Sequence, residues 1–351
     1  MSLYDSKIYL NDLDRIIEEY DSIIEMLDNT SILITGATGM ICSALIDVIF
    51  RADKKYNRNI HVYVAGRNEK SAKNRFLQYS GEQYYHFVPY DARIRNEFSF
   101  HVDYIIHGAS NSSPADIEKN GIDTMIGNFY GLYELLLYAD REKAINTLYI
   151  SSSEIYGKKD TTGLFNENEY GWVDILNPRS SYPSSKRAAE TLCACFFSEH
   201  NQKTTIVRPG HVYGPTGKRK DSHVSSVFAY AAADGNNLVM KSSGSQIRSW
   251  CYVLDAASAI LTVLAKGKGS NAYNISDKMS VMSIKDMAEL LAKKEGVKLI
   301  FDISGDKKKA GNVMDNSALD ASKLQNLGWK NVFSVAEGFG HTIKIIREAG
   351  I

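Results

Sequence analysis

The stretch ILITGATGMICSAL, residues 32–45, decides the fold. Its first four residues are an apolar run typical of a short buried strand, and its last six begin an apolar helix. Gly36 and Gly39 therefore lie in the turn between strand and helix. Glycine allows a tight turn and lets a pyrophosphate approach the helix N-terminus, where free amides and the helix dipole favour an anion. Two glycines also occur in ordinary turns, but their place at the first strand–helix junction favours a dinucleotide-binding site.

Strands and helices alternate along the chain from residue 31 to about residue 210. Alternation of this kind is typical of a parallel sheet with helices on both faces. We therefore predict an α/β fold, a Rossmann-type doubly wound parallel sheet. The expected strands are 31–35, 60–66, 84–91, 102–110, 144–153 and 203–210, and the expected helices are 40–53, 127–140 and 182–200.

The pattern divides the chain into interleaved domains. Residues 31–214 are predicted to form the dinucleotide-binding domain, and the shorter, mixed elements of 215–251 and 278–351 a smaller C-terminal substrate-binding domain. The segment NAYNIS, within about 252–277, is expected to return to the main sheet as a strand. Residues 1–30 place apolar side chains at helical spacing with acids between them, which predicts an extra N-terminal amphipathic helix packed on the body. A partner-binding role for this helix is the alternative.

Composition excludes several classes of protein. The 351 residues have a formal net charge of zero, so a nucleic-acid partner is not expected. No apolar run reaches the roughly 18–20 residues of a membrane span, and the acidic N-terminus has no apolar export signal, which favours a cytoplasmic protein. The cysteines show no metal-binding spacing, so we expect no metal and four buried, reduced thiols, Cys42, Cys193, Cys195 and Cys251.

The segment YPSSK places Tyr182 and Lys186 four residues apart, on one face of a helix. A lysine beside a phenol stabilises the phenolate and lowers a pKa that is normally about 10. Such a phenolate can take a proton from a sugar hydroxyl, and Ser152, at the end of the preceding strand, could hydrogen-bond the same hydroxyl. The spacing alone is common in helices, so the pair gains weight only together with Ser152.

Arg67 follows the second expected strand, where an acidic residue would accept hydrogen bonds from a free ribose 2′-hydroxyl. A guanidinium suits a 2′-phosphate by its charge and its fork of donors, which favours NADP. In the alternative, Arg67 stacks on the adenine and the cofactor is NAD.

These residues belong to a longer series of motifs over about residues 31–345. The motifs are TGATGMIC, YDAR, HGAS, GNFYGLYELL, SSSEIYG, YPSSK, RPGHVYGP, QIRSWCYVLDAASAI and AYNIS. In this order they resemble the extended short-chain dehydrogenase/reductase family, which comprises nucleotide-sugar epimerases, dehydratases and decarboxylases. The resemblance implies a nucleotide-sugar substrate, a nicotinamide dinucleotide that is usually NAD, and a homodimer formed through the helices at 125–139 and 182–198.

The resemblance also implies a role for individual residues. The catalytic residues would be Ser152, Tyr182 and Lys186, together with Glu154. Asp91 would touch the adenine and Arg248 would hold the substrate diphosphate, which suits a bidentate guanidinium. The cofactor-binding set is Gly36, Thr38, Gly39, Met40, Ile41, Arg67, Asp91, Ala92, Gly108, Ala109, Ser110, Asn128, Tyr182 and Lys186. The substrate-binding set is Ser110, Ser152, Ser153, Tyr182, His211 and Arg248.

Two positions depart from the family pattern. Cys42 replaces the third glycine of the phosphate turn, which serves helix–strand packing. His211 stands where the family usually has an asparagine that contacts the substrate diphosphate. A histidine can still donate one hydrogen bond.

The pair Ser153–Glu154, within SSSEIYG, indicates the reaction. In 4,6-dehydratases the two residues after the catalytic hydroxyl are Asp and Glu, and a serine is a poor general acid in place of that Asp. Ser-Glu, and the run NPRSSY–KRAAETLC, resemble UDP-glucuronate decarboxylases, which form UDP-xylose. A serine would also not repel the substrate carboxylate. The alternatives are a 4,6-dehydratase, a 4-epimerase, a non-catalytic cofactor-sensing protein, and a Glu154 that is only a solvated loop residue.

Overall fold

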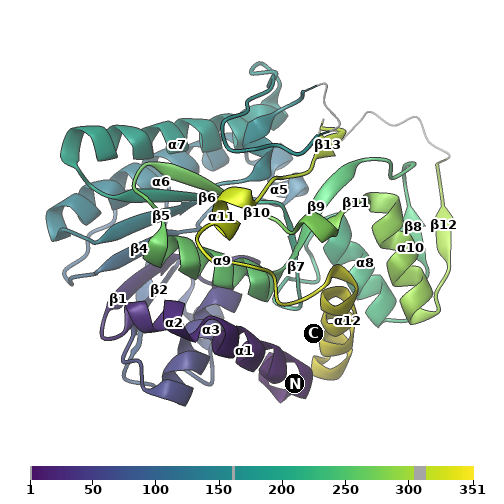
Figure 1. Cartoon of the computed structure of the whole chain (residues 1–351), viewed down its shortest axis with the longest axis horizontal. Coiled ribbons are helices and arrows are strands. Elements are labelled where there is room, and N and C mark those ends of the chain that lie inside the picture. The colour runs from purple at the N-terminus through teal and green to yellow at the C-terminus, as the bar shows by residue number, and fades with distance from the viewer. Residues whose placement is uncertain (1, 160–162, 304–313) are drawn as a thin grey trace.

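The computed structural model describes residues 2–159, 163–303 and 314–351. Its centre is a seven-stranded parallel sheet in the order β10-β6-β5-β4-β1-β2-β3 (Figure 1). The order reverses direction at β1, so the ends of β1 and β4 border a crevice of the kind in which doubly wound sheets bind ligands. The strands are β1 (Ser31–Thr35), β2 (His61–Gly66), β3 (Tyr85–Pro89), β4 (Tyr104–His107), β5 (Asn146–Ile150), β6 (Thr204–Pro209) and β10 (Asn271–Ile275).

Helices cover both faces of the sheet, as the alternating pattern predicted. Along β1, Ile32 and Ile34 enter one apolar core and Leu33 enters another, because successive side chains of a strand point to opposite faces. On the first face α3 (Met40–Tyr56) packs against α9 (Val253–Lys266), and on the second α6 (Gly121–Glu142) packs against α7 (Ser181–His200). The shorter helices α4 (Glu69–Arg75) and α5 (Pro114–Lys119) follow β2 and β4.

The expected return of the chain to the main sheet is confirmed. Strand β10 pairs in parallel with β6, from Asn271 opposite Thr205 to Ile275 opposite Pro209. Most of the other C-terminal elements lie together at the right of Figure 1. The elements after β6, apart from α9 and β10, are β7 (His211–Tyr213), α8 (Val224–Ala233), β8 (Leu238–Met240), β9 (Ile247–Tyr252), β11 (Val281–Ser283), α10 (Ile284–Glu295), β12 (Leu299–Phe301), β13 (Asn316–Ser317), α11 (Ser322–Gln325) and α12 (Val335–Ala349). Of these, α11 packs on β10 at the centre of the figure.

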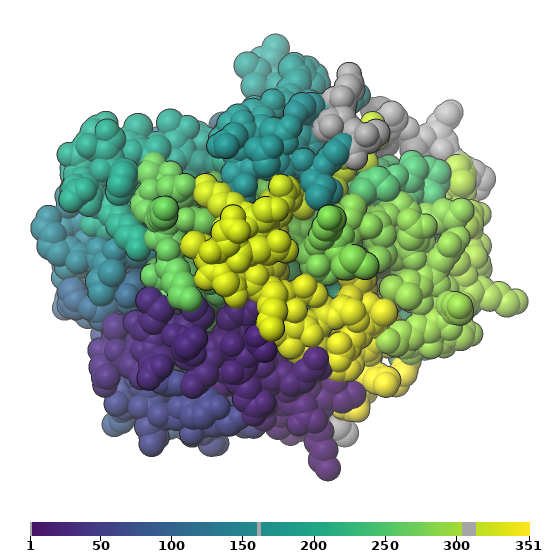
Figure 2. Space-filling view, in the orientation of Figure 1, coloured from purple at the N-terminus to yellow at the C-terminus, as the bar shows by residue number. Residues whose placement is uncertain are grey.

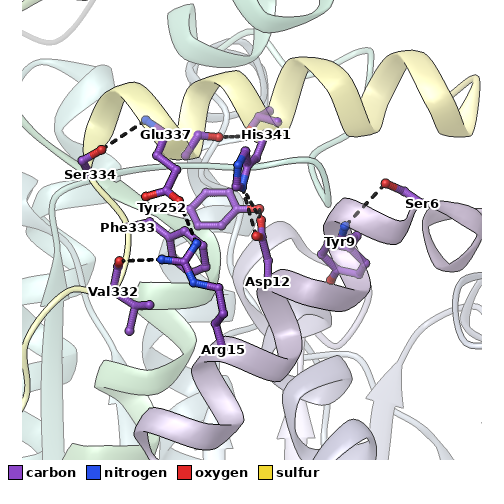
Figure 3. Close-up of polar contacts among 12 residues, drawn as sticks. Ser6, Tyr9, Asp12, Arg15, Tyr252, Val332, Phe333, Ser334, Glu337 and His341 are labelled. Atoms are coloured by element: carbon purple, nitrogen blue, oxygen red, sulfur yellow. Dashed lines mark hydrogen bonds and ion pairs between the residues drawn. The ribbon is translucent and has the colours of Figure 1, made fainter.

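The N-terminal segment packs on the body as predicted, but as two helices, α1 (Lys7–Glu19) and α2 (Asp21–Ile24), divided at Tyr20. Asp12 of α1 is buried and accepts hydrogen bonds from the Tyr252 hydroxyl at 2.9 Å and from His341 Nδ1 at 2.9 Å (Figure 3). Beside them, Arg15 forms a 2.7 Å ion pair with Glu337 of α12. The two ends of the chain therefore lie side by side, purple against yellow in Figure 2.

The cysteines correct one expectation. All four are free thiols; Cys42, Cys193 and Cys251 are buried, but Cys195 is exposed. The reason is helical geometry, because residues two apart on α7 point to different sides of the helix. Within the described residues no helix is both long and apolar enough to cross a membrane. The same residues contain no group of three or more metal-binding side chains.

Candidate active site

The turn between β1 and α3 forms a cradle that only glycine can build. Gly36 has φ +68°, and a Cβ there would lie 2.6 Å from the carbonyl oxygen of Gly108 and 2.7 Å from the amide of Ala109. Gly39 caps α3 without a side-chain hydrogen bond, and its own N–H donates to Gly36 O at 2.8 Å. The free amides at the start of α3, which include those of Met40 and Ile41, are thus open to an anion.

Cys42 fits this turn because its neighbour has no side chain. The Cys42 thiol is buried, and it occupies the space that a Cβ on Gly108 would need. Burial raises the pKa of the thiol to about 12, so Cys42 is a neutral packing residue. Gly108, which follows β4, therefore leaves the space that the Cys42 side chain needs in place of the family's third glycine.

Substitution of Gly36 tests the cradle. Gly36→Ala forces a side chain into a positive-φ position and against the backbone of Gly108, so we expect dinucleotide affinity to fall about tenfold or more by calorimetry. Gly235→Ala is the matched control, because Gly235 has φ +73° but nothing within 4 Å of an added Cβ. Equal loss of affinity in the two variants would contradict the role of the turn.

The side of the crevice at the ends of β2 and β3, where adenine is expected, contains a contact that the motifs did not single out. Asp91 is held by Arg93, whose Nε donates to Oδ1 at 3.0 Å and whose Nη2 donates to Oδ2 at 2.7 Å. These bonds lower the pKa of Asp91 to about 2, and the charge of Arg67 acts in the same direction. Arg67 itself is exposed, at the end of β2. The positive charge of Arg67 therefore acts on the Asp91 carboxylate, and it would also act on a ribose group bound at the end of β2.

Asn128 lies on α6 beneath the same crevice and is fully buried. Its Nδ2 donates to the Ser185 hydroxyl at 3.0 Å, whereas its Oδ1 has no hydrogen-bond partner among the described residues. A buried carbonyl oxygen without a partner is rare, and a donor on a bound cofactor would satisfy it. The glycine cradle and this open acceptor fit a nicotinamide dinucleotide. The other residues of the expected set line the same turns: Thr38 before α3, Ala92 after β3, and Ala109 and Ser110 after β4.

The three expected catalytic groups come from β5 and α7. Ser152 follows β5 and accepts a hydrogen bond from the Glu154 amide at 3.1 Å. The Lys186 Nζ lies 5.7 Å from the Tyr182 ring centroid and donates to Ile150 O at 2.7 Å. Burial lowers the pKa of Lys186 to about 7, while the charge of Glu190 raises it.

The expected pKa of Tyr182 is wrong for the protein alone. Burial is the main influence and raises the pKa of this phenol above its usual value, and the Glu154 carboxylate raises it further. The Ser152 hydroxyl and the Arg179 charge lower it, but they do not outweigh burial. The four-residue spacing of Tyr182 and Lys186 could not reveal the raised pKa, because the burial of Tyr182 depends on how β5, α6 and α7 pack.

Glu154 is not a solvated loop residue in the described structure. It lies in the short 3-10 helix η3 (Ser153–Tyr156), its side chain is 20% exposed, and its Oε1 accepts a 2.9 Å bond from Arg179 Nη2. Its charge raises the pKa of Tyr182 and that of Arg248, so the carboxylate faces both residues. Ser153, beside it, is buried.

The expected substrate residues His211 and Arg248 come together on the neighbouring strands β7 and β9. Arg248 is buried, which lowers its pKa to about 10. Burial also lowers the pKa of His211, and the charge of Arg248 lowers it further. His211 Nδ1 is buried and has no partner among the described residues. His223, which the motifs missed, also faces this group and hydrogen-bonds Asp221 at 2.6 Å. The sequence signal for it was weak, because a lone histidine in a polar loop is usually solvated.

Comparison with known proteins finds relatives among enzymes that act on nucleotide sugars. At 29% identity over 314 residues the chain is similar to UDP-glucuronic acid decarboxylase 6 of Arabidopsis thaliana, covering 88% of this chain and 87% of the relative. It is also 26% identical over 334 residues to human dTDP-D-glucose 4,6-dehydratase, covering 90% of both chains.

Among solved structures, the fold is similar to UDP-glucose 4-epimerase from Thermotoga maritima, solved with UDP-glucose. The TM-score is 0.78 at 22% identity, and the match covers 92% of this chain and 100% of that one. Residues 32–276 match the NAD dependent epimerase/dehydratase family. This match spans most of the chain and contains the cradle, Ser152, Tyr182 and Lys186. The chain therefore belongs to the NAD dependent epimerase/dehydratase family.

Proposed function

We propose that the chain is a nucleotide-sugar enzyme that converts UDP-glucuronate into UDP-xylose and CO₂ through a transient 4-keto sugar. The observation that carries this proposal is the placement of Glu154 beside Tyr182, with the small, buried Ser153 between Ser152 and Glu154 in the chain. The similarity to the plant UDP-glucuronic acid decarboxylase supports the same reaction.

The residues of the chain account for the first step. Tyr182 takes the proton of the sugar 4-hydroxyl, and Ser152 hydrogen-bonds that hydroxyl. Lys186 Nζ lies 5.7 Å from the centroid of the phenol ring, where its protonated form favours the phenolate. The cradle at Gly36, together with Asp91 and Asn128, would hold NAD, which when bound supplies the acceptor for the hydride from C4. Burial raises the pKa of Tyr182, and the positive charge of Arg179 acts in the opposite direction, so positive charge near the phenol favours formation of the base.

The second step needs little acid chemistry from the chain. Oxidation at C4 makes the C5 carboxylate part of a β-keto acid, which loses CO₂ and leaves its electron pair on C5 and the C4 oxygen. Ser153 neither protonates a 6-hydroxyl, as an aspartate would in a dehydratase, nor repels the carboxylate. We assign Glu154 to the transfer of the proton that C5 must then receive. Tyr182 finally returns its proton to the C4 oxygen as the hydride comes back to C4 from the bound cofactor, which gives UDP-xylose and leaves the reaction redox-neutral.

The proposal is tested by mass spectrometry of products after incubation with NAD and a panel of UDP-, dTDP-, GDP- and CDP-sugars. Loss of CO₂ from UDP-glucuronate is the expected result. Loss of water from a hexose would instead indicate a 4,6-dehydratase, and unchanged mass with inverted C4 a 4-epimerase. Absence of any reaction, with cofactor bound, would favour the non-catalytic alternative.

We expect NAD to be the preferred cofactor, because the family is NAD dependent and Arg67 faces the Asp91 carboxylate. The NADP preference drawn from Arg67 alone stays a prediction. Titration of both dinucleotides by calorimetry separates them, and tighter binding of NADP would support the argument from Arg67.

The proposed assembly is a homodimer in which α6 and α7 pack against the same helices of a second copy. One face of α6 exposes Met125, Ile126, Phe129, Tyr133 and Leu137 at helical spacing. A self-complementary apolar face of this kind fits two-fold pairing. We expect a dimer mass by light scattering and a monomer for Phe129→Asp. Leu77→Asp, at an isolated exposed site, should stay dimeric, and a monomeric wild type would contradict the proposal.

The proposed location is the cytoplasm, because all four cysteines are free thiols and a reducing compartment keeps them so. Cell fractionation tests this, and recovery of the protein from an oxidising compartment would contradict it.

A further inference from the structure

Arg179 stands directly before the catalytic helix and is held there firmly. It belongs to the 3-10 helix η4 (Pro178–Ser180), and its backbone N–H donates to the Asn177 side chain at 3.0 Å. Its side chain is only 17% exposed, and its positive charge opposes the rise that burial causes in the pKa of Tyr182. Neither the periodicity nor the family motifs assigned this residue a role.

The guanidinium uses only part of its hydrogen-bonding capacity. Arg179 Nη2 donates to Glu154 Oε1 at 2.9 Å, but the Arg179 Nε–H is buried and has no hydrogen-bond partner among the described residues. A buried donor on a charged group is costly when it is left without an acceptor. Arginine presents five donors in a planar fork and can therefore serve two carboxylates at once.

Glu154 lies between two guanidinium groups. Arg179 pairs with it directly, and the Glu154 charge also acts on Arg248. Arg248 has a second acid near it, Asp315, and His223 is paired with Asp221 at 2.6 Å. Arg179 is therefore the cation in this group whose Nε–H has no acceptor among the described residues.

We propose that Arg179 binds the sugar carboxylate of the substrate while it remains paired with Glu154, so that it bridges two carboxylates. This inference rests on the proposed function, because only a uronic acid brings such a carboxylate. Without the bridge, Glu154 and the substrate carboxylate would repel each other at close range. Arg179 thus selects a nucleotide-linked uronic acid over a neutral sugar.

The test compares two ligands that differ only in this carboxylate, UDP-glucuronate and UDP-xylose. Calorimetry is performed with NAD present in the Tyr182→Phe background, so that UDP-glucuronate is bound but not consumed. Adding Arg179→Gln should weaken UDP-glucuronate binding about 10- to 100-fold and leave UDP-xylose binding within about twofold. Adding Arg179→Lys, which keeps the charge, should restore part of the affinity.

In steady-state assays with Tyr182 intact, Arg179→Gln should raise KM for UDP-glucuronate far more than it lowers kcat, because the bridge forms in the ground state. Arg187→Gln is the matched structural control, since Arg187 donates to Ile155 O and Tyr156 O of the same η3 turn. That variant should weaken both ligands alike.

The outcomes distinguish the proposed role of Arg179 in binding the carboxylate from the proposed decarboxylation reaction. Equal weakening of UDP-glucuronate and UDP-xylose by Arg179→Gln would make Arg179 a structural anchor and overturn the inference. A wild type that binds UDP-glucuronate selectively but releases no CO₂ would contradict the proposed reaction while leaving the bridge intact. A wild type that binds neither nucleotide sugar overturns both.

Discussion

Tyr182→Phe should lower turnover of UDP-glucuronate by about 10²–10⁴-fold, the usual cost of losing a general base. The substitution removes only the hydroxyl and keeps the ring, which is buried between β5 and α7. Folding and dinucleotide binding should therefore persist. In a single turnover with bound NAD, this variant should give no absorbance of reduced nicotinamide, because the 4-hydroxyl cannot be deprotonated and the hydride cannot leave C4.

A second tyrosine provides the control for this variant. Tyr85 is buried on β3, remote from Tyr182 in the sheet order, and its hydroxyl has no hydrogen-bond partner among the described residues. Tyr85→Phe should retain full turnover and nearly unchanged thermal stability. If Tyr182→Phe is folded and retains near-normal turnover, the assigned mechanism is wrong and Glu154 loses its catalytic role with it.

Glu154→Gln should separate the two halves of the reaction. The Glu154 carboxylate raises the pKa of Tyr182, so its neutralisation should ease formation of the phenolate and leave the first step at least as fast. The later proton transfer should be about 10²-fold slower or more. Reduced nicotinamide should therefore accumulate in a single turnover while the UDP-xylose signal rises slowly. Measurements by stopped-flow absorbance and quenched mass spectrometry follow the two events in one sample.

Glu169→Gln is the corresponding control, because Glu169 is a loop carboxylate that pairs with Lys159 outside the described site. It should behave as the wild type in both measurements. Slow formation of reduced nicotinamide in Glu154→Gln would place Glu154 in the first step and contradict the assignment.

The fold was predictable because local pattern and tertiary structure agree. The central strands β1, β4 and β5 are almost completely buried and carry apolar runs, and the turn at Gly36 requires a residue without a side chain. Strand β10 was also predicted, although its sequence NAYNI is more polar and its neighbour β6 is distant in sequence. The break in the N-terminal segment at Tyr20 was missed, because the apolar spacing continues through it.

The site was only partly predictable. Ser152, Tyr182 and Lys186 follow a recognisable spacing, but the raised pKa of Tyr182 reflects burial, which spacing does not encode. Arg179 could not be singled out, since its partner Glu154 lies 25 residues earlier and pairing depends on how η3 meets η4. Compensation of Cys42 by Gly108 is likewise a contact between distant parts of the sequence, the first turn of α3 and the residue that follows β4.

The most direct test of the central claim, a transient 4-keto sugar that loses CO₂, is an isotope experiment on the wild type. UDP-glucuronate carrying deuterium at C4 is incubated with NAD in ordinary water, and the product is analysed by mass spectrometry and NMR. The account predicts UDP-xylose that lacks the carboxyl carbon, keeps the deuterium at C4 and carries two protons at C5. A product that retains the carboxylate, or one that loses CO₂ but exchanges the C4 deuterium completely with solvent, would contradict it.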